Sequence, residues 1–329
     1  MSPSTRAAFH GLVSRGIPVL YRSTVWDACR KYHASGSTSA APAPSFSDLV
    51  DTPIPAQTAA EIEKDVDRTF PGHSNFSSEK EHSQLQSILT AFAAAHPEIG
   101  YCQGLSFLAF SLSLFFSPDQ TLDVLSFVVI DILGANYFDS DMKGRFADML
   151  VIQHLTRAQF PRLFFLLEAH EVDVGVATFS WFLVMFAGLF RDMELTFRIW
   201  DVVLSEGSPV FLFRVALALI ASNEDSLIAL LESMGDEEEE EGENVNVNQR
   251  LTDLPLQWTD CDALIRSAYK IALPGESAFV SFFAGSAGTK VAFDEEVLRL
   301  RARYKEKVEE GGEQEEEGDD SNEEGEGGN

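Results

Sequence analysis

The sequence predicts an all-α protein built as one large multi-helix domain. Apolar residues recur at helical spacing along most of the 329 residues, and few stretches alternate apolar and polar residues as a half-buried strand would. Hydrophobic residues make up 45% of the chain and include 26 phenylalanines, so the material for a thick core is present. We therefore expect helices that pack around a shared interior.

The helix with the clearest boundaries is expected between Ser78 and His96. Ser78 and Glu81 form a capping box, in which each side chain can bond the backbone amide of the other residue, and apolar residues at helical spacing follow. Pro97 then ends the helix, because the residue before a proline avoids the helical region. The same spacing predicts further helices at 105–116, 122–133, 149–155, 162–169, 179–190, 195–204, 210–220, 225–234, 260–272 and 295–308.

Another helix is expected from Thr58 toward Pro71. Thr58 and Glu61 match a second capping box ahead of an apolar face. Pro71 ends this helix for the steric reason already given. Arg68 therefore falls in its last turn.

Several segments do not fit the helical pattern. Residues 34–55 are rich in Ser, Ala and Pro and predict a mobile surface loop, and residues 235–249 predict a second, acidic loop. The tail at 308–329 is almost purely Glu, Asp and Gly. It is expected to be disordered, because it cannot bury enough apolar surface to offset its ordering entropy. The chain thus divides into an N-terminal lead at 1–11, one domain at 12–307 and the acidic tail.

The formal net charge of −28 is concentrated in two acidic runs. Seven acids lie within Asp236–Glu243 and eleven within Glu309–Glu326, where no Lys or Arg occurs. The rest of the chain offers no basic stripe for a phosphate backbone. No nucleic acid is therefore expected as a partner.

The cysteines and the apolar runs indicate a cytoplasmic protein. Cys29, Cys102 and Cys261 are odd in number and too far apart for a disulfide framework or a zinc site. The amino terminus has no apolar core of signal-peptide length, and the longest apolar runs, 105–116 and 175–190, fall short of the ~20 residues of a membrane-spanning helix. We expect at most peripheral association with an endomembrane through a partner.

Signatures of a self-contained enzyme are missing from the sequence. Gly285–Lys290 fails the spacing of a phosphate-binding loop, His170-Glu171 lacks the second histidine of a zinc protease helix, and no serine lies in a Gly-x-Ser-x-Gly elbow. The seven histidines are scattered. We therefore expect the chain to hold no nucleotide, cofactor or metal of its own.

Asp65 and Arg68 form the first polar pair to which a function can be assigned. They are three residues apart on one helical face, so the carboxylate can orient the guanidinium. The structural alternative is a surface ion pair worth roughly 0–1 kcal/mol. Spacing alone favours that alternative, because such pairs are common on helices.

Gln103 lies in a second candidate segment, Gly100–Gly104. Its two glycines let the backbone turn sharply before the apolar helix that begins near Leu105, so Gln103 would be presented at a helix amino terminus. The alternative is a glutamine that caps the helix or satisfies loop amides. A third segment contains Arg22 and Trp26, for which the structural alternative is a core tryptophan with an arginine stacked over an aromatic ring.

Together, these three segments resemble the TBC domain of Rab GTPase-activating proteins. The signature blocks of that family appear in order, as Arg-x-x-x-Trp at Arg22–Trp26, Ile-x-x-Asp-x-x-Arg at Ile62–Arg68 and Tyr-x-Gln at Tyr101–Gln103. The resemblance covers roughly residues 12–307. From this sequence we expect two departures, the acidic loop and the lack of an extra domain that would direct the protein to a membrane.

The resemblance implies catalysis in trans on a partner GTPase. Arg68 would stabilise the charge that develops on the transferred phosphoryl group, and Gln103 would position the attacking water. Asp65 would orient Arg68. The other supporting residues implied by the family pattern are Thr69, Tyr101, Gly104, Arg22 and Trp26.

The implied partner is a small GTPase of the Rab family, which would itself hold GTP and Mg²⁺, and the implied process is vesicle trafficking. The main alternative is a TBC-type scaffold that binds a GTPase without stimulating hydrolysis, and the presence of both Arg68 and Gln103 argues against it. A helical scaffold acting through its acidic tail is a weaker alternative. Selectivity depends on surface shape, so the sequence identifies neither the particular Rab nor the membrane compartment.

Overall fold

The computed structural model describes residues 3–34, 44–70, 78–138, 142–234, 241–272 and 293–308. Within these ranges the chain is helical and contains no strand, which confirms the all-α fold class. The predicted acidic tail lies outside the described residues, apart from residue 308.

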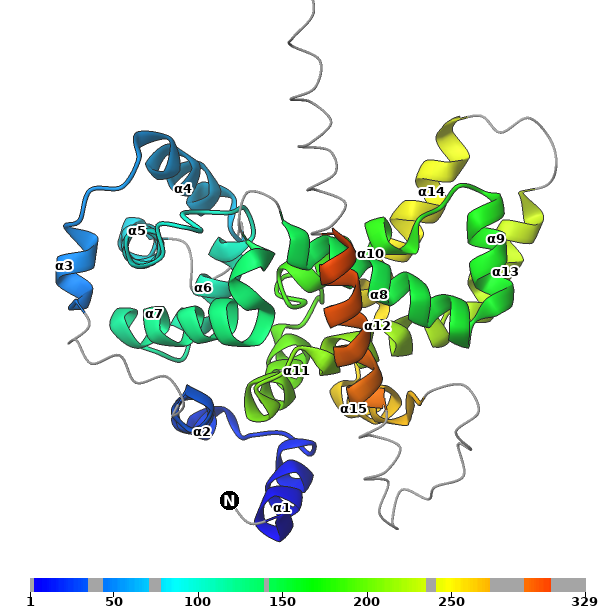
Figure 1. Cartoon of the computed structure of the whole chain (residues 1–329), viewed down its shortest axis with the longest axis horizontal. Coiled ribbons are helices and arrows are strands. Elements are labelled where there is room, and N and C mark those ends of the chain that lie inside the picture. Colours follow the sequence, from blue (N-terminus) through cyan, green and yellow to red (C-terminus); the bar gives the residue numbers. More distant parts are fainter. Residues whose placement is uncertain are drawn as a thin grey trace, which may run out of the picture.

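Figure 1 shows the elements in chain order. They are α1 (Pro3–Val13), α2 (Val19–Ala34), α3 (Phe46–Val50), α4 (Ala56–Arg68), α5 (Glu79–Ala95), α6 (Leu105–Ser113), α7 (Pro118–Ser126), the π-helix η1 (Phe127–Gly134), the 3-10 helix η2 (Ala135–Tyr137), α8 (Lys143–Gln159), α9 (Pro161–Ala169), α10 (Val174–Leu183), α11 (Met193–Glu206), α12 (Val210–Ala221), α13 (Glu224–Ser233), α14 (Glu241–Thr252), the 3-10 helix η3 (Leu254–Gln257) and α15 (Cys261–Lys270). A last helix covers residues 293–308.

Helix α5 has the boundaries that the sequence predicts. Ser78 is its N-cap, with both bonds of the capping box to Glu81 present, and His96 is its C-cap. Helices α11 and α15 begin behind Asp192 and Asp260, whose side chains accept backbone amides of the first turn. Each of these caps satisfies amides that have no partner inside the helix.

The capping box predicted at Thr58 and Glu61 is wrong. Helix α4 begins earlier, directly after Pro55, which makes no side-chain bond to the helix. Glu61 instead accepts a bond from Gln57 at 3.0 Å. Proline holds φ near the helical value and can lead into a helix without a capping side chain. Arg68 ends α4, as predicted.

Two segments predicted as loops contain helices, and the N-terminal lead does too. The 34–55 segment includes α3, whose Leu49 is buried and which packs on α5. In the 235–249 segment, α14 begins at Glu241, and Val247 of this helix is fully buried. The lead at 1–11 forms most of α1. A few apolar residues in a polar stretch are enough to dock a short helix, and the overall composition conceals them.

The helix predicted at 179–190 is displaced. Helix α10 begins earlier and ends at Leu183, and Met185 and Phe186 then adopt positive φ angles of 47° and 64°. The carbonyls of Met185 and Phe186 accept bonds from Trp200 at 2.8 Å and Thr196 at 3.0 Å. In a continued helix, these two carbonyls would accept bonds from backbone amides further along the helix. Here the side chains of α11 donate those bonds instead.

The core centres on α11 and α12. Every residue of α12 from Val210 to Ile220 is buried, as expected for a helix whose residues are apolar with the single exception of Arg214. Helix α12 contacts α8, α11 and α15. In Figure 1, α3 to α7 lie on one side of it, and α9, α13 and α14 lie on the other. None of the described helices is both long and apolar enough to span a membrane.

The last helix, 293–308, joins α8 and α12. Arg301 bonds the buried carboxylate of Asp148 on α8 at 2.6 Å. Asp294 accepts a bond from Arg214 of α12 at 3.0 Å. Burial raises the pKa of Asp148 despite the nearby Arg301. This helix, orange in Figure 1, is therefore part of the folded unit.

Candidate functional site

Arg68 projects into solvent from the last turn of α4. Its side chain is 46% exposed, whereas the Asp65 side chain is only 6% exposed. The predicted ion pair between Arg68 Nη2 and Asp65 Oδ1 is present. Asp65 is held by packing because the neighbouring Ile62 and Val66 are buried. The pair therefore has one fixed member and one accessible member.

The residues after Arg68 attach the end of α4 to α6. Thr69 is fully buried, and its hydroxyl donates to the carbonyl of Asp65 at 2.6 Å. The ring centroid of Phe70 lies 5.0 Å from that of Phe107 and 4.8 Å from that of Phe110, both on α6. Phe70 has a positive φ of 45°, a conformation that is rare for a bulky residue and has to be held by its surroundings.

The segment from Tyr101 to Gly104 brings Gln103 to the start of α6. Gly104 is the N-cap of α6, with a positive φ of 107°. A Cβ atom at this position would lie 3.1 Å from Cγ of Leu183, so both the conformation and the close packing favour glycine. Gln103 is exposed beside this buried glycine. The amide is thus presented at a helix amino terminus, as predicted.

Asp65 connects the two halves of the site. The Tyr101 hydroxyl donates to Asp65 Oδ2 at 2.7 Å, while Arg68 pairs with Oδ1. Burial and the bond to Asp65 raise the pKa of Tyr101, so the phenol stays protonated and remains a donor. One buried carboxylate thus fixes the loop of Gln103 relative to the helix of Arg68.

The Rab-GTPase-TBC domain family model matches residues 20–228. The chain belongs to the Rab-GTPase-TBC domain family. The TBC chain is 35% identical over 217 residues to Small G protein signaling modulator 3 of Homo sapiens, a match that covers 65% of this chain and 27% of that protein. It is 33% identical over 227 residues to TBC1 domain family member 2B of Mus musculus, a match that covers 68% of this chain and 23% of that protein. The matches thus span about a quarter of the length of these curated relatives.

Two solved structures share the fold of this TBC domain. The Chlamydomonas flagellar RabGAP TBC domain has a TM-score of 0.67 at 23% identity and covers 82% of this chain and 86% of its own. The Ypt/Rab-GAP domain of Gyp1p has a TM-score of 0.62 at 18% identity, and the match covers 80% of this chain and 91% of the Gyp1p chain. The single multi-helix architecture is therefore that of a TBC domain.

Arg22 and Trp26 lie in the core of the TBC domain, away from the solvent. Arg22 bonds Glu194 at 2.7 Å and Asp201 at 3.2 Å, and the indole of Trp26 donates to Asp201 at 2.9 Å. Burial raises the pKa of Asp201 even though Arg22 opposes this shift. The guanidinium of Arg22 lies 5.6 Å from the ring of Phe197. Both residues therefore anchor α2 to α11, as in the structural alternative.

Arg145 of α8 is a neighbour of the site that the sequence patterns do not reveal. It is 5% exposed, its guanidinium lies 5.5 Å from the ring centroid of Phe179, and its Nε has no hydrogen-bond partner among the described residues. Burial raises the pKa of the Cys102 thiol, and the charge of Arg145 partly offsets that effect. No local sequence pattern predicts that Arg145 lies near the site, because its interaction with Cys102 joins segments that are distant in sequence.

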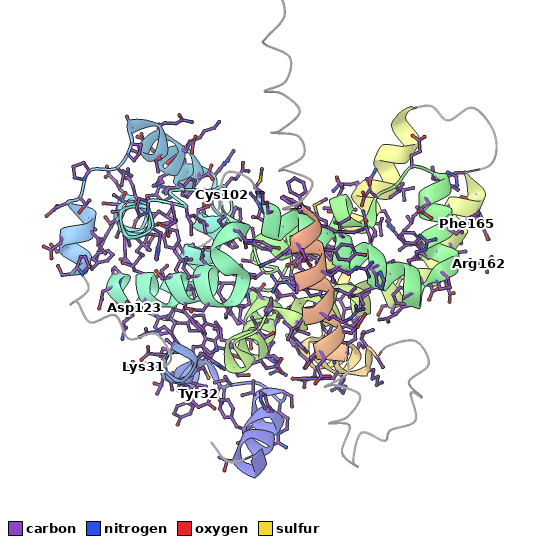
Figure 2. The ribbon with its side chains drawn as sticks, viewed as in Figure 1. Lys31, Tyr32, Cys102, Asp123, Arg162 and Phe165 are labelled. Atoms are coloured by element: carbon purple, nitrogen blue, oxygen red, sulfur yellow. The ribbon has the colours of Figure 1, made fainter. Side chains whose placement is uncertain are left out.

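The described part of the TBC domain contains no group of three His, Cys, Asp or Glu side chains placed to hold a metal ion. Figure 2 shows Cys102 in the upper part of the molecule. The site presents the exposed guanidinium of Arg68 and the exposed amide of Gln103. These groups can stabilise charge and position a small molecule in a partner's site.

Proposed function

We propose that this TBC domain accelerates GTP hydrolysis by a small GTPase of the Rab family, with Arg68 and Gln103 acting in trans. The observation that carries the proposal is the bridge through Asp65, which holds the exposed Arg68 of α4 and the loop of the exposed Gln103 together. Family membership supplies the class of partner. The matches span only about a quarter of the length of the curated relatives, so the partner of the whole protein belongs to the proposal as well.

Arg68 supplies a permanent positive charge. Phosphoryl transfer to water places negative charge on the γ-phosphate oxygens and the β–γ bridge oxygen, and a planar guanidinium in a dry interface stabilises that charge. Asp65 lies on the protein side of the guanidinium and restricts its direction. Fewer side-chain conformations then have to be lost when the partner docks.

Gln103 positions the attacking water. A neutral amide can both accept from and donate to the water without changing the local charge. The Tyr101 hydroxyl bond and the buried Gly104 hold the loop that presents this amide. GTP and Mg²⁺ are bound by the partner in this mechanism. We place the reaction in vesicle trafficking, in the cytoplasm or at the surface of an endomembrane.

A TBC scaffold that binds its GTPase without stimulating hydrolysis is the competing function. Such a scaffold needs an interface but neither an exposed arginine nor a carboxylate that orients it. A screen of single-turnover phosphate release, with the purified chain against a panel of GTP-loaded Rab proteins, separates the two. Stimulation of at least one member is expected, and binding without stimulation would favour the scaffold.

The role of Gln103 is tested by four combinations of proteins. If Gln103 positions the water, the GTPase's own switch glutamine becomes redundant, because two amides cannot hold one water in the same geometry. A Rab protein with that glutamine changed to alanine should still be stimulated by the wild-type chain. Gln103→Ala should fail even on the unmodified Rab. The reverse pattern would show that Arg68 acts without Gln103.

A further inference from the structure

An exposed apolar face lies on α2, next to the end of α1. Of the ten exposed large hydrophobic side chains among the described residues, four lie on α2, namely Val19, Leu20, Tyr21 and Tyr32, and a fifth, Leu12, lies near the end of α1. Leu20 is 84% exposed, and Val19 and Tyr21 are each 61% exposed. Single exposed apolar residues are ordinary, but three in succession on a well-packed helix form a patch that indicates a binding surface.

The patch continues along the outer face of α2. Leu20 and Tyr21 return to the same face at Lys31 and Tyr32, because eleven residues make about three helical turns. Between them, Thr24 and Ala28 are the exposed residues of this face. The opposite face is buried through Arg22 and Trp26, so α2 cannot rotate these side chains inward. We call the exposed side chains from Val19 to Tyr32 the α2 outer face.

The α2 outer face carries no carboxylate, in a chain with 52 acids and 24 basic residues. The first 34 residues contain five Arg or Lys and a single acid, Asp27. Arg22 is buried against Glu194 and Asp201, and Arg30 also pairs with Asp123, so the exposed positive charge of this surface comes from Arg15 and Lys31. Asp27 is paired with both Arg30 and Lys31, at 2.9 and 2.6 Å. Arg15 is exposed in the turn between Leu12 and Val19. An anionic surface would repel most of this molecule, but it would attract or tolerate this face.

We propose that the α2 outer face and the turn before it bind the surface of a membrane that contains anionic lipids. Val19 and Leu20 enter the boundary between head groups and acyl chains, and Tyr21 and Tyr32 lie at the interface, where an apolar ring with a polar tip is favoured. Arg15 and Lys31 bind lipid phosphate and carboxylate groups. A fluid bilayer accepts projecting side chains in any arrangement, so no matching groove is required.

The position of the face fits attachment during GTPase activation. Figure 2 shows Lys31 and Tyr32 at the lower left of the molecule, above α1, and Cys102, the residue before Gln103, in the upper part. A chain attached through α2 therefore leaves Arg68 and Gln103 accessible. The contact is direct and needs no GTPase, so it is independent of the proposed function.

Vesicle flotation of the full chain tests the proposal. The wild-type chain should float with vesicles of phosphatidylcholine and phosphatidylserine, and much less with phosphatidylcholine alone. Changing both Leu20→Ser and Tyr21→Ser should lower the bound-to-free ratio about tenfold or more. Arg15→Gln should lower it about fivefold, and only on the anionic vesicles. The matched control is Phe165→Ser on α9, which is 70% exposed on another edge and should bind as wild type does.

Each variant is first shown to keep the helical spectrum and melting temperature of the wild type. The proposal is overturned if the wild-type chain does not float with the anionic vesicles, or if the double variant floats as well as the wild type. A concentration-dependent dimer that the double variant abolishes would also overturn it, because the α2 outer face would then bind a second copy of the chain. Size-exclusion chromatography with light scattering supplies that measurement.

Discussion

Replacing Arg68 with alanine distinguishes a catalytic arginine from a surface ion pair, because the two interpretations predict effects of very different size. The side chain is 46% exposed, so water screens its bond to Asp65 and can replace the guanidinium when it is removed. The stability lost with such a pair is about 0–1 kcal/mol. An arginine that reaches the γ-phosphate of a bound GTPase contributes about 10³–10⁵ in rate, or roughly 4–7 kcal/mol.

The assay is single-turnover phosphate release from a GTP-loaded Rab protein, with thermal unfolding measured in parallel. Arg68→Lys should lose nearly as much rate as Arg68→Ala, because an ammonium group lacks the planar fork. Arg162 provides the matched control, since it is 67% exposed and pairs with Glu232 on the surface. Arg162→Ala should change neither rate nor stability. A folded Arg68→Ala protein that stimulates hydrolysis like the wild type refutes the reasoning.

The remaining predictions concern Tyr101, the acidic tail and His96. Tyr101→Phe removes a bond to a buried carboxylate, so the free energy of unfolding should fall by about 1–3 kcal/mol and the stimulated rate should fall as well; lost stability at an unchanged rate would separate this bond from the site. Truncation after Lys307 should leave both the melting temperature and the stimulated rate unchanged at moderate salt, and a loss of activity would make the tail a docking element. Burial lowers the pKa of His96 below its usual 6.5, so the unfolded chain binds the proton more tightly and stability should fall as the pH drops below 6.5. Urea titrations at about pH 7.5 and 5.5 should show this loss, and the loss should be smaller in His96→Gln; equal losses in both proteins would assign the effect to other groups.

Local sequence signals predicted elements wherever a helix is stabilised by its own residues. The capping box of Ser78 and the run at 210–220, which is apolar apart from Arg214, predicted α5 and α12 nearly to their ends. These signals failed where contacts between distant segments determine whether a helix forms or ends. Met185 and Phe186 break the predicted helix because side chains of α11 bond their carbonyls. Leu49 docks α3 from a stretch whose composition predicts a loop.

By itself, the sequence determined the helical class, the family and the two side chains proposed to act in GTP hydrolysis. Periodicity and the order of short motifs can be read directly from a linear sequence. Arg68 and Gln103 could be named on that basis. Only the tertiary structure decided how they are held together. The bond from Tyr101 to Asp65 joins residues 36 positions apart, and the placement of Arg145 beside Cys102 joins segments still more distant in sequence. Such contacts depend on how whole helices pack, and no local spacing encodes them.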